Sequence, residues 1–413
     1  MSVNVLPIGP QPHPFHIRIC EFLKRNEPAL WNWFAADRVR TEQAETLRLE
    51  LLKTTYRVDR DHQPEVYNVA ADVASALGVV APITIYQEQN SPGLNASLAY
   101  LPGEVHVVLR GPLREQLNSQ ELRALLGHEL THFHLWEQQG GELRVADQIL
   151  AACSRDSQSH PAFSESWRLA RLYTEIVCDR GGFQVVGDHL AVISTLLKLE
   201  TGTSDVHPES YLRQAEEILS REQEGTEGVT HPESFIRARA IQLWAIQDSD
   251  VEALTSRMIE GEPGLLQLDL LRQEQVANAT CRLIDGLLEP KWFQTPAAVA
   301  HARRYFEGYS SAKSASPSID TSIEPQFLQK SLVDYFSFVL LDFVTIDPDL
   351  EFVPLAAALE MADRLGFGER FRELARTELK LGKKQLQGVD RDKQSLVQRA
   401  GVEHAKRPAG EGG

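Results

Sequence analysis

The chain of 413 residues has few cysteines, and none lie at a metal-binding spacing. Its four cysteines are scattered and form no C-x-x-C pair: Cys20, Cys153, Cys178 and Cys281. Disulfide frameworks and thiolate zinc sites depend on clustered or regularly spaced cysteines. We therefore expect neither of them, and this cysteine usage predicts a reducing, cytoplasmic location.

Long apolar runs and excess positive charge are also missing. A transmembrane helix needs about 20 apolar residues, and the longest candidate, residues 336–344, is short and interrupted by Asp342. The first 20 residues lack a basic segment followed by an apolar run, so no secretory signal is expected. The 42 Lys and Arg against 58 Asp and Glu give a net charge of −16, which disfavours nucleic acid as a partner.

The composition that remains is that of a globular protein, with 42% apolar and 24% charged residues. At about 150 residues per domain, the length suggests two or three domains. A proline-rich start predicts an extended arm over residues 1–20, and the main globular region follows over 21–307. The division then continues with a Ser-rich linker at 308–322, a helical module at 323–388 and a flexible tail at 389–413.

Local patterns predict which elements carry the motifs. Residues 79–87, 95–100 and 104–109 are rich in β-branched or alternating apolar residues and predict strands. Asn118 and Glu121 have the spacing of a capping box and predict the start of a strong helix that runs to about residue 138. Further helical patterns occur at 142–153, 165–180, 186–200, 208–222 and 232–246.

The main chemical signal lies inside that strong helix. Residues 127–132 read GHELTH and contain the pattern HExxH. Positions i and i+4 of a helix lie about 40° apart around the axis and about 6 Å along it, so His128 and His132 can reach one metal ion. Glu129 would stand beside that ion, placed to take a proton from water. The pattern therefore predicts a zinc site.

A catalytic zinc ion needs a third protein ligand and an open position. Glu175 and Asp179 lie at i and i+4 on a later predicted helix, which suits a ligand and an acceptor that orients an imidazole. From the residues alone, this pair also fits an exposed acidic helix face. Other candidates are His160, His189, His207, His231 and several acids.

The order HExxH, then ExxxD, then a His-Pro motif resembles the HtpX-like and CaaX-prenyl-protease family of gluzincin zinc metallopeptidases, over about residues 50–250. The resemblance implies an α+β fold: a zincin-like core, built from a small antiparallel or mixed sheet and active-site helices. It also implies one Zn²⁺ ion held by His128, His132 and Glu175, with Asp179 as the residue that orients a ligand.

The family's His-Pro motif has an arginine six residues after the histidine. His231 and Arg237 match it, and the resemblance implies that both support catalysis. His207 and Arg213 have the same spacing; we prefer His231 because the sequence around it, THP and then RARAIQLW, is more similar to the family. The alternative for His231 is a local role before Pro232 at a helix start.

Asn95 and Ala96, with residues 104–113, resemble the family's edge strand and the strand before its HExxH helix. A substrate peptide could add to such an edge as a further strand. Two features depart from the family: members such as HtpX carry transmembrane helices, which are not expected here, and Cys178 stands where a small residue is usual. The C-terminal module is weakly similar to TerB-like helical domains and is a candidate surface for a protein partner.

These observations predict a zinc-dependent metalloendopeptidase that hydrolyses peptide bonds in proteins or peptides, with Glu129 as general base. Two alternatives are a zinc-bound interaction module with little turnover and a metal-dependent hydrolase of a non-peptide amide. No residue of the motif is damaged, which favours the peptidase over the interaction module. The edge strand that could accept a peptide favours it over the amide hydrolase.

Overall fold

The chain is described by a computed structural model that covers residues 9–89, 93–221, 225–261, 264–265, 267–310 and 330–406. The described residues divide into two compact units. Unit 1 comprises the residues up to 261 together with 269–271, and unit 2 comprises 264, 265, 267, 268 and the residues from 272 onward. Every residue predicted for the site lies in unit 1.

Unit 1 contains a mixed sheet of four strands in the order β1-β2-β4-β3. The strands are β1 Thr55–Arg57, β2 Ile83–Glu88, β3 Asn95–Leu101 and β4 Glu104–Arg110. β2 and β4 are parallel, whereas β1 and β3 are antiparallel to their neighbours. β3 therefore forms one edge of the sheet. The three predicted strands are present, and the short β1 is an additional strand.

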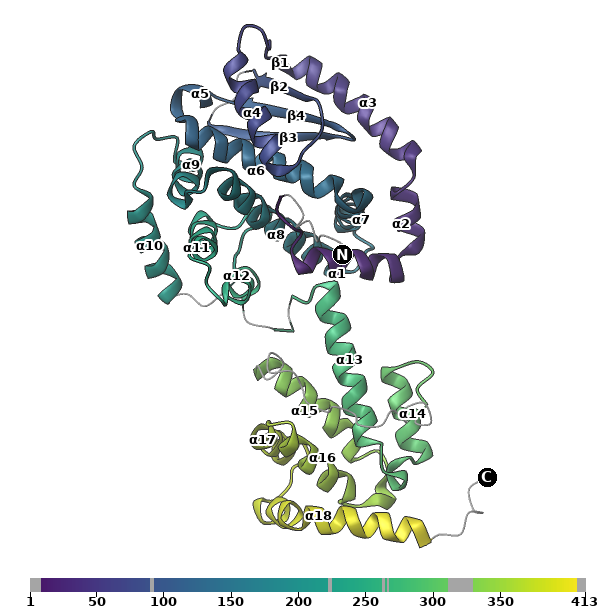
Figure 1. Ribbon diagram of the computed structural model, residues 1–413. Coiled ribbons are helices and arrows are strands. Elements are labelled where there is room, and N and C mark those ends of the chain that lie inside the picture. Colours follow the sequence, from purple (N-terminus) through teal and green to yellow (C-terminus); the bar gives the residue numbers. More distant parts are fainter. Residues whose placement is uncertain are drawn as a thin grey trace, which may run out of the picture. The chain divides into compact units, whose positions relative to one another are not determined.

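Apolar side chains of β4 point alternately to the two faces of this sheet, and both faces are buried. Val105, Val107 and Leu109 belong to the core shared with α4 and α6, while Val108 packs with Leu51 of α3 on the other face. Successive side chains of a strand point to opposite faces, which accounts for a strand buried almost throughout. The sheet is thus held between α3 and the pair of α4 and α6 (Figure 1).

Twelve helices of unit 1 are described. Their bounds are α1 Pro14–Asn26, α2 Pro28–Phe34, α3 Asp37–Thr54, α4 Pro64–Leu77, α5 Leu113–Gln116, α6 Ser119–Glu137, α7 Glu142–Arg155, α8 Pro161–Val186, α9 His189–Thr201, α10 Pro208–Arg221, α11 Ser234–Ala245 and α12 Val251–Glu260. The predicted capping box is confirmed: Asn118 accepts from the backbone of Glu121, and the Glu121 carboxylate accepts from the backbone of Asn118.

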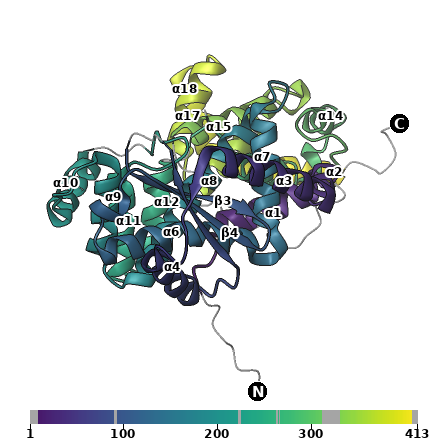
Figure 2. The same cartoon turned by 90° about the horizontal axis from the view of Figure 1, so that it is seen from above.

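α6 and α8 run side by side beneath the sheet (Figures 1 and 2). Three glycines let their backbones approach: a Cβ atom at Gly127 would lie 2.9 Å from the Gly182 Cα atom, and one at Gly182 would lie 2.8 Å from the Ala124 carbonyl oxygen. Gly181 faces Thr131 in the same seam. This close approach explains why α8 continues for 26 residues through two glycines that would otherwise weaken a helix.

The N-terminal segment differs from the expected extended arm, because α1 begins at Pro14. Proline is favoured at the first position of a helix, where its missing N–H costs nothing, and the His13 side chain caps the helix. Ile19 and Leu23 are buried in the core of unit 1, and His16 Nε2 lies 2.8 Å from the Ala170 carbonyl oxygen of α8. Residues 14–20 are therefore part of the folded unit.

The described part of unit 2 is helical. Its helices are α13 Leu270–Leu287, which starts at the junction of the units, α14 Pro296–Tyr305, α15 Lys330–Val344, α16 Val353–Arg364, α17 Gly368–Glu378 and α18 Lys383–Lys406. They share one apolar core, in which Phe293, Phe336, Phe343 and Phe371 are fully buried.

The boundaries of the two units differ from the expected ones. The residues of α13 and α14 were expected within the main region, 21–307, but Leu283 and Ala302 pack into the core of unit 2. The expected tail from residue 389 belongs largely to α18, which buries Leu386 and Val389. Of the expected linker, only residues 308–310 lie within the described part. Among the described residues, no helix is both long and apolar enough to cross a bilayer.

Candidate metal centre and cleft

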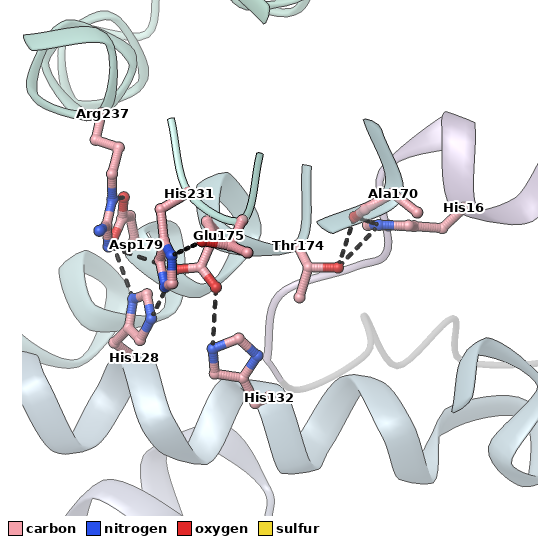
Figure 3. A network of polar contacts seen from close by, with 10 residues as sticks. His16, His128, His132, Ala170, Thr174, Glu175, Asp179, His231 and Arg237 are labelled. Carbon is pink, nitrogen blue, oxygen red and sulfur yellow. Dashed lines mark hydrogen bonds and ion pairs between the residues drawn. The ribbon is translucent and has the colours of Figure 1, made fainter. Parts of the chain in front are cut away.

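Two antiparallel helices bring the predicted ligands together. His128 of α6 lies opposite Asp179 of α8, and His132, one turn later, lies opposite Glu175, one turn earlier (Figure 3). Glu175 Oε2 lies 3.3 Å from His128 Nε2, and Oε1 lies 3.6 Å from His132 Nε2. The two imidazoles therefore direct their Nε2 atoms at one carboxylate.

These spacings fit a shared zinc ion. Hydrogen bonds between such charged groups are about 2.7–2.9 Å long, whereas donors about 2.0–2.2 Å from one tetrahedral ion lie ~3.3 Å apart. Within the described part of the chain, Glu175 Oε2 is buried and makes no hydrogen bond. An orphaned carboxylate oxygen among imidazole nitrogens is the environment that a cation completes, so these residues fit the zinc ion that the sequence predicts.

Asp179 and Arg237 fix one of the imidazoles. His128 Nδ1 donates to Asp179 Oδ1 over 2.9 Å, which leaves Nε2 as the free donor atom. Arg237 of α11 then holds the same carboxylate with two hydrogen bonds, from Nε at 2.8 Å and from Nη2 at 2.6 Å. Two of the five N–H donors of Arg237, on Nε and Nη2, are thus engaged by Asp179.

Burial and charge act against each other on these groups. Burial alone would raise the pKa of the Glu175 and Asp179 carboxyls. At Glu175 this effect is outweighed by His128, so the pKa is lowered. At Asp179 it is outweighed by Arg237 and then by His128, and the pKa is again lowered. Burial would lower the pKa of His128, but Asp179 and Glu175 raise it to about 10 in the absence of metal. Both carboxylates are therefore ionised, as ligands and their partners must be.

Glu129 stands beside this group, and no ion pair is found for it within the part of the chain that the structure describes. Burial raises its pKa to about 7, the charge of Glu175 adds to that rise, and the charge of His128 opposes it. The Leu98 backbone of β3 also hydrogen-bonds to this carboxylate. A carboxyl with a pKa near neutrality is matched to accepting and returning a proton.

Cys178 offers a second possible donor set. Its sulfur and one ring nitrogen from each of His128 and His132 all lie within 4.8 Å of one another. The thiol is fully buried, and burial raises its pKa well above the usual value, with the charges of Glu175 and Asp179 adding to the rise. A protonated thiol is a poor ligand, whereas Glu175 is ionised and faces both Nε2 atoms. The geometry therefore favours Glu175 as the third donor.

The two His-Pro motifs have different surroundings. His231 Nε2 lies 3.5 Å from Glu175 Oε2, and the ring lines the cleft above His128 and His132 (Figure 3). Burial lowers the pKa of His231 below its usual value, so the ring is neutral at pH 7. The His207 side chain is 80% exposed and lies 3.9 Å from Asp205. Of the two, only His231 is brought to the site.

A cleft of about 630 Å³ passes over these residues. Along one side it is lined by β3, including Asn95, Ala96 and Leu98. Because Leu98 directs its amide at Glu129, Ala96, two residues earlier, presents its backbone to the same side. The Asn95 side chain accepts a hydrogen bond from the Ala96 amide at 2.8 Å. The predicted edge strand therefore lies beside the Glu129 carboxyl.

Sequence reasoning missed several residues of the cleft. Trp136 contacts the His132 ring, with centroids 5.8 Å apart, and Arg171 lines the cleft one helical turn before Glu175. Both follow the helical spacing that identified the ligands: position 136 is four residues after His132, and position 171 is four residues before Glu175. Extending the i, i+4 pattern by one turn in each helix would have found them.

The geometry agrees with comparisons to known proteins. Residues 60–245 match the sequence model of Peptidase family M48. This region of the chain belongs to peptidase family M48. The M48 region contains every residue of the metal centre, from His128 to Arg237.

One curated relative carries the same classification. The chain is 28% identical over 257 residues to the Plastoglobule-localized metallopeptidase 48, chloroplastic, of Arabidopsis thaliana, which covers 56% of this chain and 71% of the relative. The comparison with solved structures gives no match. The M48 assignment makes the chain a peptidase of a zinc-dependent, metal-binding hydrolase family.

Proposed function

We propose that unit 1 is a zinc-dependent endopeptidase that cuts peptide bonds in proteins or peptides. The observation that carries this proposal is the convergence of two imidazole Nε2 atoms on the Glu175 carboxylate, beside an edge strand and the Glu129 carboxyl. His128, His132 and Glu175 would hold one ion. A bound zinc ion lowers the pKa of a water molecule and polarises the scissile carbonyl.

Glu129 provides the proton transfers. Its carboxylate takes a proton from the attacking water and then passes it to the leaving amine. A pKa of about 7 suits both steps, since the group must be a base in the first and an acid in the second. The Leu98 amide holds the carboxylate against β3, where a bound peptide would lie.

His231 and Arg237 act at different distances from the reacting atoms. His231 faces the space above Glu175 and would donate a hydrogen bond to the oxyanion that develops from the carbonyl. Arg237 would work through Asp179, keeping that carboxylate aligned with His128. This assignment narrows the sequence-based expectation, which gave both residues a direct role.

Peptide is favoured over a non-peptide amide because the cleft runs along an edge strand. The amides of Ala96 and Leu98 are engaged by Asn95 and Glu129, so an extended chain would pair with the carbonyl oxygens of these two residues. Such pairing gives affinity that does not depend on side chains. A zinc-bound interaction module is not favoured, since binding alone would not require a carboxyl beside the ion with a pKa of about 7, as Glu129 has. The proposal also includes a protein partner that binds the helical unit 2. It further includes a cytoplasmic location, which is based on the cysteine usage.

Two substitutions test the mechanism. Glu129→Gln keeps the zinc ligands but removes the base, so we expect full zinc content and casein cleavage reduced by about 10²–10⁴-fold. Glu115→Gln, at an exposed position of α5, is the matched control and should behave as the unsubstituted protein. Casein cleavage that survives in Glu129→Gln would overturn the mechanism.

The third ligand is tested by metal analysis. Glu175→Ala should lower the zinc content, while Cys178→Ala should keep it. If instead zinc is retained in Glu175→Ala and lost in Cys178→Ala, the donor set is completed by the thiol.

A further inference from the structure

One cation of the cleft, Arg171, makes no direct ion pair with a carboxylate among the described residues. Three arginines line the cleft: Arg110, Arg171 and Arg237. Arg110 pairs with Glu88 at 2.7 Å, and Arg237 is held by Asp179. Across the ranges that the structure describes, no hydrogen bond or ion pair is found for Arg171, whose guanidinium instead lies 4.9 Å from the centre of the Trp167 ring. This stacking holds the side chain and leaves its N–H groups available.

Arg171 lies close to the metal centre. Its helix position is one turn before Glu175, which corresponds to about 6 Å along α8. The antiparallel pairing of α6 and α8 matches His128 with Asp179 and His132 with Glu175. One further turn matches Trp136 with Arg171. The guanidinium therefore belongs to the Trp136 end of the cleft.

The direction of β3 decides which part of a peptide reaches this end. Leu98 hydrogen-bonds to Glu129, and further along β3 the Tyr100 ring contacts Trp136 at 5.3 Å, so β3 and α6 run in the same direction. Antiparallel pairing is the more stable and the more frequent arrangement. A peptide antiparallel to β3 would place its N-terminal part at Trp136 and its C-terminal part at Asn95.

The distance then identifies the substrate position. An extended peptide advances about 3.4 Å per residue, so a subsite one helical turn from the metal centre receives a residue two or three positions before the scissile bond. Asp147 lines the same end of the cleft but accepts a hydrogen bond from Trp167 Nε1 at 3.1 Å. Arg144, Arg155 and Arg171 all act on its charge, so cations outnumber this one carboxylate.

We propose that Arg171 forms a specificity subsite that binds the carboxylate of an acidic residue two or three positions before the scissile bond. A guanidinium binds a carboxylate through two parallel hydrogen bonds, a geometry that neither Gln nor Lys in the substrate can reproduce. This inference rests on the proposed endopeptidase function, because it assumes an extended peptide on β3.

The test uses the full-length, zinc-loaded protein and peptides built on a sequence that it cuts in casein. The residue two or three positions before the cut is set to Glu, Gln or Lys. We expect the Glu peptide to be cut with a kcat/KM about tenfold higher than the Gln peptide, mainly through KM, because hydrogen bonds to charged groups are worth about 1.5–3 kcal/mol. Arg171→Gln should remove this preference while the Gln peptide is cut as before.

Two further variants sharpen the result. Arg171→Glu should invert the preference, so that the Lys peptide is cut better than the Glu peptide. Arg213→Gln, an exposed residue of α10 outside the cleft lining, makes the same change in net charge and should keep the preference for Glu. Equal cutting of the Glu and Gln peptides, or a preference that survives in Arg171→Gln, would overturn the subsite.

A binding measurement separates this failure from failure of the proposed function. Fluorescence anisotropy of labelled peptides on the Glu129→Gln protein needs no turnover. If the protein cuts no peptide but binds the Glu peptide about tenfold more tightly than the Gln peptide, the endopeptidase proposal fails and the Arg171 subsite stands. If peptides are cut and both bind equally, the subsite alone fails.

Discussion

The two His-Pro motifs differ in fate although their sequences nearly repeat. Residues 207–213 read HPESYLR and residues 231–237 read HPESFIR. His207 and Arg213 are exposed at the start of α10, whereas His231 lies over Glu175 and Arg237 is buried against Asp179. α11 packs directly on α8, the helix that carries Glu175, while α10 packs on α9 and α11. The packing partner of the helix, rather than the motif, decides which copy reaches the metal centre.

The loop before the second motif is also tied in place. Arg168 of α8 donates to the carbonyl oxygens of Thr226 and Gly228, each at 3.1 Å. The Glu233 carboxylate accepts from the Thr226 hydroxyl and from the Glu227 amide. These bonds fix the turn that presents His231 to the cleft. The His231 motif therefore follows a loop that hydrogen bonds fix to α8 and to Glu233.

The largest contrast is expected between Arg237→Ala and Arg213→Ala. Removing Arg237 leaves the buried Asp179 carboxylate without its cation, a loss that costs about 3–5 kcal/mol. The exposed Arg213 should change stability by less than about 0.5 kcal/mol. Urea unfolding of both variants measures the difference. Similar free energies of unfolding would mean that the buried pair does not distinguish the two motifs.

The next contrast is kinetic. His231→Ala should lower kcat by about 10²–10³-fold, the usual cost of losing one donor to a developing oxyanion, with little change in KM. His207→Ala should match the unsubstituted protein, because this ring is exposed and does not line the cleft. Steady-state cleavage of one peptide by both variants decides the matter, and an equal loss in both would remove the oxyanion role from His231.

The smallest contrast concerns the hydrogen bonds from Arg168 to the loop before His231. Arg168→Gln should lower kcat by roughly tenfold, since it loses charge-assisted hydrogen bonds to the loop that are worth about 1.5–3 kcal/mol in a favourable setting. Arg221→Gln, on the exposed end of α10, is the control. Hydrogen exchange of residues 225–231 should become faster in the first variant alone. Unchanged exchange there would show that His231 is positioned by other contacts.

Some of the fold could be predicted because the signals are local. The capping box at Asn118 and Glu121 marked α6 to within a residue, and alternation over 104–109 marked β4. Helical spacing placed His128 and His132 on one face. In each case the residues that form the element also carry its pattern, so that no knowledge of the tertiary structure was needed.

Other features depend on contacts between distant segments. Pro14 was taken as part of an arm, because only the packing of Ile19 against the core reveals the helix that it starts. The unit boundary near residue 262 depends on which core the apolar residues of α13 enter, and they enter the core of unit 2. Glu175 needed a family resemblance for its assignment, since an i, i+4 acidic pair looks the same on an exposed face.

The glycine seam between α6 and α8 has a thermodynamic consequence. Where an ion itself gathers its donors, loading is coupled to folding and changes the heat capacity strongly. Here the backbones meet at Gly127 and Gly182, so the distance from the histidines to Glu175 is set by main-chain contact. The conformational entropy of bringing the three donors together is therefore lost when the helices pack during folding, before zinc binds. Calorimetric titration with zinc should then register proton release and bond formation, with almost no heat-capacity change.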